Sequence, residues 1–311
     1  MKETIKIEEL KQGDILLFSH TDEWDSKLIS LITNSPVSHA AMSYYDYSQI
    51  VEETPPCAVV NELEQRKTGR EITVMRLKND EDMTKVLDIA KKYVEEKEPY
   101  GNANLIFIFV YLLFEKAAIS VKLQRLLCTL IKFILSELIK LLDDVFRKGT
   151  HPMVCSQFVY NCYMTAGDEY RLKIWSKSGK NNILNKIKDY IEENKESLHE
   201  ILNMNITKIE EEHNCALEIN KEELLKSMYE ELILDSKTGS LISEENLEED
   251  FVILVCKFLL LLSKLYNRSR GECNDNINNI INDLCAMEEY FVTPGDLLVN
   301  CDNLQNIGVL E

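Results

Sequence analysis

The chain has 311 residues with 53 acidic and 35 basic side chains, so its formal charge is −18. This acidity argues against nucleic acid as the main partner, because phosphate binding needs clustered lysine and arginine. With 45% apolar and 28% charged residues, the composition is that of a globular protein with a sizeable core, in one large or two smaller domains.

The first third of the chain is predicted to form short strands separated by turns. Gly13 and Asp14 give a turn signal before the first apolar run. Apolar or alternating runs predict strands at residues 15–18, 38–45, 49–53 and 72–77. Residues 58–60 are expected to extend the third of these strands after a break at Pro55 and Pro56.

Helical spacing of apolar residues begins in the middle of the chain. Residues 83–96 show this spacing, and residues 105–114 are ten consecutive apolar residues. A membrane span needs about 18 or more apolar residues, so we interpret 105–114 as a buried helix. Residues 117–146 place leucine and isoleucine on one helical face.

The segment 115–148 carries seven basic and four acidic residues. One interpretation is an amphipathic helix packed on the core. The alternative is a lid or membrane-surface helix near a lipid-handling site, with peripheral membrane contact through residues 116–148.

The second half of the chain is predicted to be mainly helical. Residues 153–166 are expected to form a short helix after His151 and Pro152, and residues 171–290, which are poor in glycine and acidic, show a helical pattern. The part from 191 to 250 holds 18 acidic and 5 basic residues, which would suit a basic protein partner or a solvated helical surface.

Two features mark the end of the chain. Residues 251–265 are apolar but short and contain Lys257, so we expect a core helix and not a membrane span. The turn signal at 293–296 is expected to lead into a strand at 297–299.

The nine cysteines are scattered and none form a C-x-x-C pair. The N-terminus lacks the apolar run of a secretory signal, so we expect reduced thiols in the cytoplasm. The odd number of cysteines leaves room for one kept for its reactivity.

Cys155 differs from the other cysteines because it begins an expected helix, in the sequence MVCSQFVYNCYM. The helix dipole there favours the thiolate, which is the nucleophilic form of cysteine. His39 begins a strand and is followed by two alanines, which leave room for a partner side chain or a substrate. The alternatives are a buried structural cysteine and a structural strand histidine.

Glu52 and Glu53 lie at the end of the following strand. A carboxylate bonded to His39 would fix its tautomer and stabilise the imidazolium. Because strand side chains alternate between faces, only one of the two glutamates can point at His39. A metal site from Cys155, His39 and a carboxylate is an alternative that lacks paired ligand spacing, so we expect neither a metal nor a cofactor.

Six motifs follow one another along the chain: GDILLF at 13–18, SPVSHAAM at 35–42, IVEE at 50–53, PYG at 99–101, CSQFV at 155–159 and TPGDLL at 293–298. In this order they resemble the circularly permuted papain-like cysteine hydrolases of the NlpC superfamily. The chain looks most like the YiiX/YaeF group, which is related to lecithin:retinol acyltransferase. The resemblance covers about 1–115, 150–168 and 291–311, roughly half the chain.

The resemblance implies Cys155 as nucleophile, His39 as base and Glu52 as the orienting third member, with Glu53 as a fallback. It implies weaker roles near the substrate or oxyanion for Tyr100, Ser38 and Ser156. Gly101 stands where relatives often carry an acid, which weakens the transfer to Tyr100.

The implied fold is α+β, with a mainly antiparallel sheet packed on helices and large helical insertions. The catalytic core would comprise residues 1–170, with a helical segment at about 115–148, and would be completed by 291–311. Residues 171–290 would be an acidic helical insertion.

The first functional hypothesis is a cysteine hydrolase of amide, ester or thioester bonds, acting on a small peptide or an acyl or lipid substrate. A variant is an acyltransferase of the lecithin:retinol acyltransferase type. The second hypothesis is a non-catalytic binding or effector protein that uses its acidic helical insertion.

Overall fold

The computed structural model describes residues 3–79, 81–114, 120–148, 152–175, 183–194, 196, 220–238, 247–267 and 291–311. The chain divides into two compact units. The first comprises Met1–Leu105, Thr150–Lys177 and Glu288–Glu311, and the second comprises Ile106–Gly149 and Ser178–Met287. This division groups residues 106–149 with the later helical region, whereas segment 115–148 is expected from the sequence to belong to the first domain.

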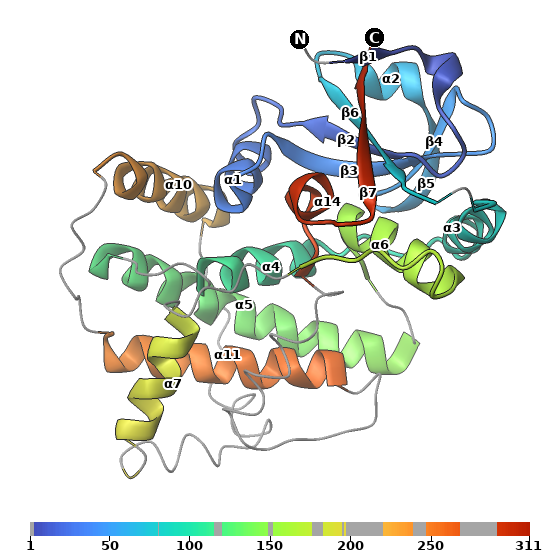
Figure 1. Ribbon diagram of the computed structural model, residues 1–311. Coiled ribbons are helices and arrows are strands. Elements are labelled where there is room, and N and C mark those ends of the chain that lie inside the picture. Colours follow the sequence, from blue (N-terminus) through green and yellow to red (C-terminus); the bar gives the residue numbers. More distant parts are fainter. Residues whose placement is uncertain are drawn as a thin grey trace. The chain divides into compact units, whose positions relative to one another are not determined.

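The first unit is built on a mostly antiparallel sheet, which confirms the predicted α+β class (Figure 1). Within the described residues the sheet has seven strands in the order β1-β7-β6-β2-β3-β4-β5, and only β1 and β7 pair in parallel. The strands are β1 (Thr4–Ile5), β2 (Ile15–Ser19), β3 (Val37–Ser43), β4 (Gln49–Thr54), β5 (Cys57–Glu62), β6 (Ile72–Leu77) and β7 (Leu304–Leu310).

Both faces of this sheet are apolar and each is covered. The helical elements of the unit are η1 (Ile7–Glu9), α1 (Trp24–Thr33), α2 (Leu63–Lys67), α3 (Thr84–Glu96), α6 (Cys155–Ala166) and α14 (Pro294–Val299). On one face of the sheet, Leu17 and Met42 pack in a cluster with Phe158 and Val159 of α6. The opposite face buries Leu16 and Val74 together with Leu63 of α2.

Residues 58–60 do not extend β4, so that prediction is wrong. They belong to β5, which turns back after Pro55 and Pro56 and pairs antiparallel with β4, with Val59 opposite Glu52. The two prolines end β4, because proline lacks the amide N–H that would continue the ladder.

The predicted strand at residues 297–299 is also wrong, because these residues are helical in α14. Thr293 caps this helix: its Oγ1 accepts a hydrogen bond from the Asp296 amide at 3.1 Å. In return, the Asp296 carboxylate accepts one from the Thr293 amide at 2.9 Å. This reciprocal pair, with Pro294 at the first helical position, starts a helix where a turn and strand were expected.

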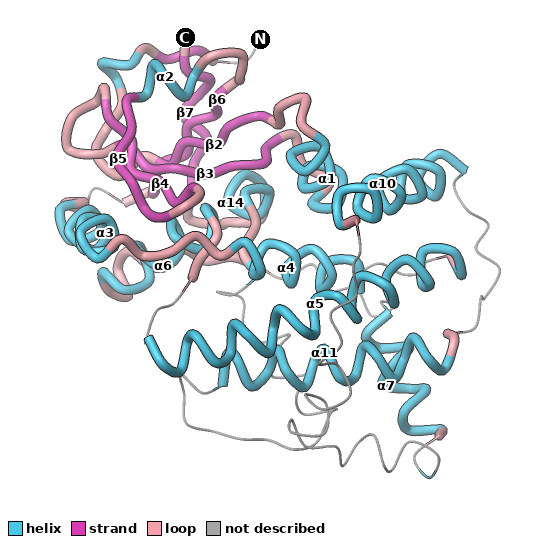
Figure 2. Tube along the Cα trace, turned by 180° about the vertical axis from the view of Figure 1, so that it is seen from behind, coloured by secondary structure: helices cyan, strands magenta, loops and turns pink. Residues whose placement is uncertain are grey.

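The second unit is helical in its described residues (Figure 2). Its helices are α4 (Asn102–Phe114, which begins in the first unit), α5 (Val121–Lys148), α7 (Ile183–Glu193), α10 (Lys221–Thr238) and α11 (Glu249–Asn267). Helix α5 contacts both α10 and α11. Its apolar face is buried from Leu123 to Leu135, as expected for an amphipathic helix packed in a core.

No helix among the described residues combines the length and apolarity needed to cross a membrane. Peripheral membrane contact through 116–148 stays a prediction. The basic partner for 191–250 also stays a prediction, and much of that segment lies outside the described residues.

Candidate active site

The candidate site lies where strands β3 and β4 separate. They share a short ladder with Met42 opposite Val51 and Ser43 opposite Ile50. Beyond this ladder, β3 continues along β2 as far as Val37, and β4 continues along β5 to its end at Thr54. His39 and Glu52 lie on these separating stretches. Helix α6 contacts both strands and therefore brings its own residues to the same place.

Cys155 is the first residue of α6, so the predicted helix start is confirmed. The first intrahelical hydrogen bond runs from the Phe158 amide to the Val154 carbonyl, at 2.9 Å. The Gln157 side chain accepts a bond from the Val154 amide at 3.0 Å and fixes the entry to the helix. Because α6 packs its apolar face on the sheet, this helix start is held in position. The thiol lies at the positive end of the helix dipole.

The Cys155 thiol and the His39 imidazole are hydrogen-bonded to each other. Burial raises the pKa of the thiol, but the charge and hydrogen bond of His39 and the backbone N–H groups of Ala40 and Ser156 outweigh it and leave the pKa lowered. Burial alone lowers the pKa of His39, but the Cys155 thiolate and Glu52 raise it to about 9. The environment therefore favours a thiolate beside an imidazolium.

Glu52 holds the other side of the imidazole. His39 Nε2 lies 2.5 Å from Glu52 Oε2, which leaves Nδ1 for Cys155. The carboxylate is fully buried and also accepts from Asn61 Nδ2 at 2.7 Å and from Arg66 Nη2 at 3.0 Å. Burial raises the pKa of Glu52, but these partners lower it to about 2, so the group stays ionised.

Glu53 points to the opposite face of β4 and does not meet His39. Its side chain is fully buried, and neither carboxylate oxygen has a hydrogen-bond partner among the described residues. Burial, followed by the neighbouring Glu98 and Cys155, raises its pKa to about 9. Of the two glutamates singled out in the sequence, the structure thus brings Glu52 to the imidazole.

The three weaker candidates take different places. Tyr100 forms a backbone bridge with Met153, two residues before Cys155. Ser156 donates its hydroxyl to the Val292 carbonyl at 2.7 Å, so it approaches the thiol through its backbone amide alone. Ser38 is buried and shares a 2.7 Å hydrogen bond with Ser26.

Asn61 and Arg66 are site residues that sequence reasoning missed. Asn61 lies on β5 two residues beyond Val59, the cross-strand partner of Glu52, and so shares its face. Arg66 comes from α2 and lies 2.7 Å from Glu52 Oε1 through its Nε. A polar residue directly after the apolar run CAVV was the available signal for Asn61, but the β4–β5 register was needed to interpret it.

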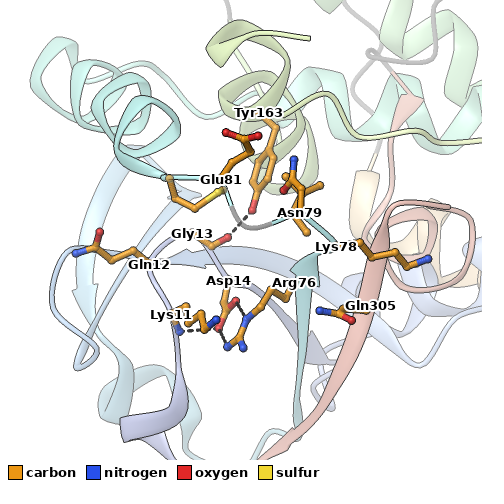
Figure 3. Close-up of a pocket in the computed structure, with 12 residues that line it drawn as sticks. Lys11, Gln12, Gly13, Asp14, Arg76, Lys78, Asn79, Glu81, Tyr163 and Gln305 are labelled. Carbon is orange, nitrogen blue, oxygen red and sulfur yellow. Dashed lines mark hydrogen bonds and ion pairs between the residues drawn. The ribbon is translucent and has the colours of Figure 1, made fainter. Parts of the chain in front are cut away.

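A separate polar pocket of about 200 Å³ lies in the same unit, and Figure 3 shows residues that line it. Asp14 and Arg76 form a bidentate ion pair on the wall of this pocket. Arg76 Nε lies 2.7 Å from Asp14 Oδ1, and Arg76 Nη2 lies 2.6 Å from Asp14 Oδ2. Tyr163 of α6 donates its hydroxyl to the carbonyl of Gly13 beside them. Because these polar groups satisfy one another, we interpret this wall as a link between the Gly13 turn and α6.

Among the described residues, no group of three histidine, cysteine or acidic side chains is arranged to hold a metal ion. No protein-family model matches the chain, and no curated protein matches it. Among solved structures, the chain is similar to the crystal structure of the metalloprotein YiiX from Escherichia coli O157:H7, DUF1105. The TM-score is 0.33 and the identity 18%, over 58% of this chain and 81% of that chain. A likeness this distant carries no argument about activity.

Proposed function

We propose that this protein is a cysteine hydrolase that cleaves an amide, ester or thioester bond through a thioester acyl-enzyme. We further propose that it is a circularly permuted papain-like member of the NlpC superfamily. The observation that carries the proposal is the hydrogen-bonded series from Cys155 through His39 to a buried, ionised Glu52. Nucleophile, base and orienting group in this arrangement are what thiol catalysis requires.

In the first step, the Cys155 thiolate attacks the substrate carbonyl and forms the carbon–sulfur bond. The backbone N–H of Cys155 precedes the first intrahelical bond and is therefore available to the oxyanion. The His39 imidazolium then protonates the leaving amine, alcohol or thiol, and the former acyl bond breaks. Glu52 holds the ring with Nδ1 toward sulfur throughout.

In the second step, a water molecule resolves the thioester. Neutral His39 takes a proton from the water as it attacks the thioester carbonyl, and the Cys155 thiolate leaves. The products are a carboxylic acid and the restored thiolate–imidazolium pair. An amine or alcohol in place of water would make the same site an acyltransferase.

The test is an acyl-enzyme assay with activated esters and thioesters of short peptides and fatty acids. We expect mass spectrometry to find the acyl group on Cys155, and Cys155→Ala to abolish both labelling and turnover. Added amines or alcohols that take the acyl group faster than water would indicate the transferase. An unmodified Cys155 with all donors, or a Cys155→Ala variant that retains turnover, would refute the proposal.

We also propose that the protein works in the reducing environment of the cytoplasm. The six described cysteines, including Cys155, are all free thiols. A thiolate nucleophile is active only while it stays reduced. Mass measurement of the protein from cells, after rapid alkylation, would check this, because a Cys155 disulfide would contradict it.

A further inference from the structure

Arg70 lies near the candidate site, one aromatic ring away from His39. Its guanidinium stacks over the ring of Phe18, 5.1 Å from the centroid. The Phe18 ring in turn packs against the His39 ring, with centroids 5.5 Å apart. Only one aromatic ring therefore separates the guanidinium from the imidazole.

The guanidinium is fixed along one edge. Nε donates to the Ser19 carbonyl at 2.8 Å, and Nη2 donates to Ser38 Oγ at 3.2 Å. Ser38 is itself held by Ser26. These bonds leave the outer edge, formed by Nη1 and the second hydrogen of Nη2, for another acceptor.

Arg70 forms no ion pair with any carboxylate among the described residues, although it is half-buried. The neighbouring Arg66 is paired with Glu52, and Arg76 is paired with Asp14. Glu23 and Glu52 are near enough to act on the charge of Arg70, as is the Cys155 thiolate. An unpaired, half-buried cation is uncommon, because burial of a charge is costly without a partner.

We propose that Arg70 binds a carboxylate of the substrate, close to the bond that Cys155 attacks. A carboxylate matches the free edge of one guanidinium with two parallel hydrogen bonds. Arg66 also acts on the charge of Arg70, but Arg66 is paired with Glu52, so Arg70 offers one unpaired positive charge and a monoanion suits it better than a phosphate dianion. This inference rests on the proposed function and narrows its substrate class to acidic acyl compounds or peptides.

The test compares two small thiol reagents that differ in charge. Iodoacetate carries a carboxylate and iodoacetamide is its neutral counterpart, so both report on Cys155 without a known substrate. Their rates of reaction with Cys155 are measured near pH 6 by peptide mass spectrometry. The variants are Arg70→Gln, Arg70→Lys and Arg171→Gln. Arg171 is exposed beyond the far end of α6 and controls for the change in net charge.

We expect Arg70→Gln to slow the iodoacetate reaction by about 3- to 10-fold, the range of a partly exposed ion pair, and iodoacetamide by less than about twofold. Arg70→Lys should keep part of the preference for iodoacetate, because it keeps the charge, and Arg171→Gln should change neither rate.

Equal effects of Arg70→Gln on both reagents, or none, would overturn the carboxylate subsite while leaving the nucleophile intact. Protection of Cys155 by inorganic phosphate but not by acetate would also overturn it, in favour of a phosphate. A Cys155 that resists both reagents would overturn the proposed function itself, and the subsite with it.

Discussion

Replacing Glu53 with glutamine should stabilise the protein at neutral pH. Glu53 is fully buried, its oxygens have no hydrogen-bond partner among the described residues, and its pKa is raised to about 9. The folded protein therefore holds this group protonated at pH 7, whereas the unfolded chain releases the proton. Glutamine keeps the shape of the protonated acid without this cost.

The size of the effect follows from the two pKa values. The ordinary pKa of glutamate is 4.5, so pH 7 lies 2.5 pH units above it. At 1.36 kcal/mol per pH unit, keeping Glu53 protonated in the folded protein lowers the free energy of unfolding by about 3.4 kcal/mol. An unpaired amide N–H in the variant offsets about 1 kcal/mol of the gain. We expect Glu53→Gln to raise the free energy of unfolding by about 2–3 kcal/mol at pH 7, and by less than about 1 kcal/mol at pH 5.

The sign of the pH dependence separates this account from simple repacking. The folded-state pKa is raised, so the unfolding free energy of the wild type should fall, relative to the variant, as pH rises from about 4.5 to 9. The matched control is Glu52→Gln on the opposite face of the same strand. Because the pKa of Glu52 is lowered to about 2, that change should destabilise at pH 7, by about 3–5 kcal/mol, and the difference should vanish as pH falls toward 2.

Both measurements can be made by denaturant unfolding followed by tryptophan fluorescence. The chain has two tryptophans, Trp24 and Trp175, and both belong to the unit that contains Glu53. The signal therefore reports on that unit. A Glu53→Gln variant less stable than the wild type at pH 8, or a difference that does not change between pH 5 and 8, would refute the reasoning.

Three further predictions follow from the site and the fold. The turnover rate should rise as pH passes the lowered pKa of Cys155, and it should fall above about pH 9, where His39 loses its proton. A fall in rate already near the ordinary pKa of histidine would contradict the thiolate–imidazolium pair. Thr293→Ala should lower the unfolding free energy by about 1 kcal/mol through loss of the α14 cap, and Thr293→Ser should not. Gly13→Ala should lower the free energy of unfolding by about 1–3 kcal/mol, because Gly13 has φ +77° and an added Cβ would lie 2.7 Å from Met83 Cε. An unchanged denaturation midpoint would contradict this prediction.

Local patterns predicted many of the elements. The alternation at 72–77 matches β6, and the helical spacing at 83–96 matches α3 within one residue. The run at 105–114 lies in α4 as predicted. These signals depend on side-chain periodicity within a single element, which the sequence contains in full.

The errors came where the same short motif fits two structures. TPGD at residues 293–296 was interpreted as a turn before a strand, but Thr293 and Asp296 cap each other and begin a helix. The strand that was expected there begins later, at Leu304. Pairing with strands far away in the sequence locates it, because Val309 lies opposite Thr4 of β1 and Thr73 of β6.

The site shows the same division between local and distant information. The position of Cys155 at a helix start could be predicted from neighbouring residues. Neighbouring residues alone left the choice between Glu52 and Glu53 open, because it depends on which face of β4 meets His39; the family resemblance favoured Glu52. The sequence did not indicate Arg70 as a residue near the site, for a similar reason. Arg70 comes beside Ser38 only because Phe18 pairs with Ile72 across β2 and β6.

The most direct test of the central claim is the pH dependence of Cys155 alkylation by iodoacetamide in the native protein. Cys128 and Cys301 serve as internal controls, because both are half-buried and burial raises their pKa. We predict that Cys155 reacts below about pH 7, which is well under the ordinary cysteine pKa of about 8.5, while both control cysteines stay unmodified. We also predict that His39→Ala removes this reactivity of Cys155. A Cys155 that reacts only at alkaline pH, alongside the controls and regardless of His39, would contradict the account.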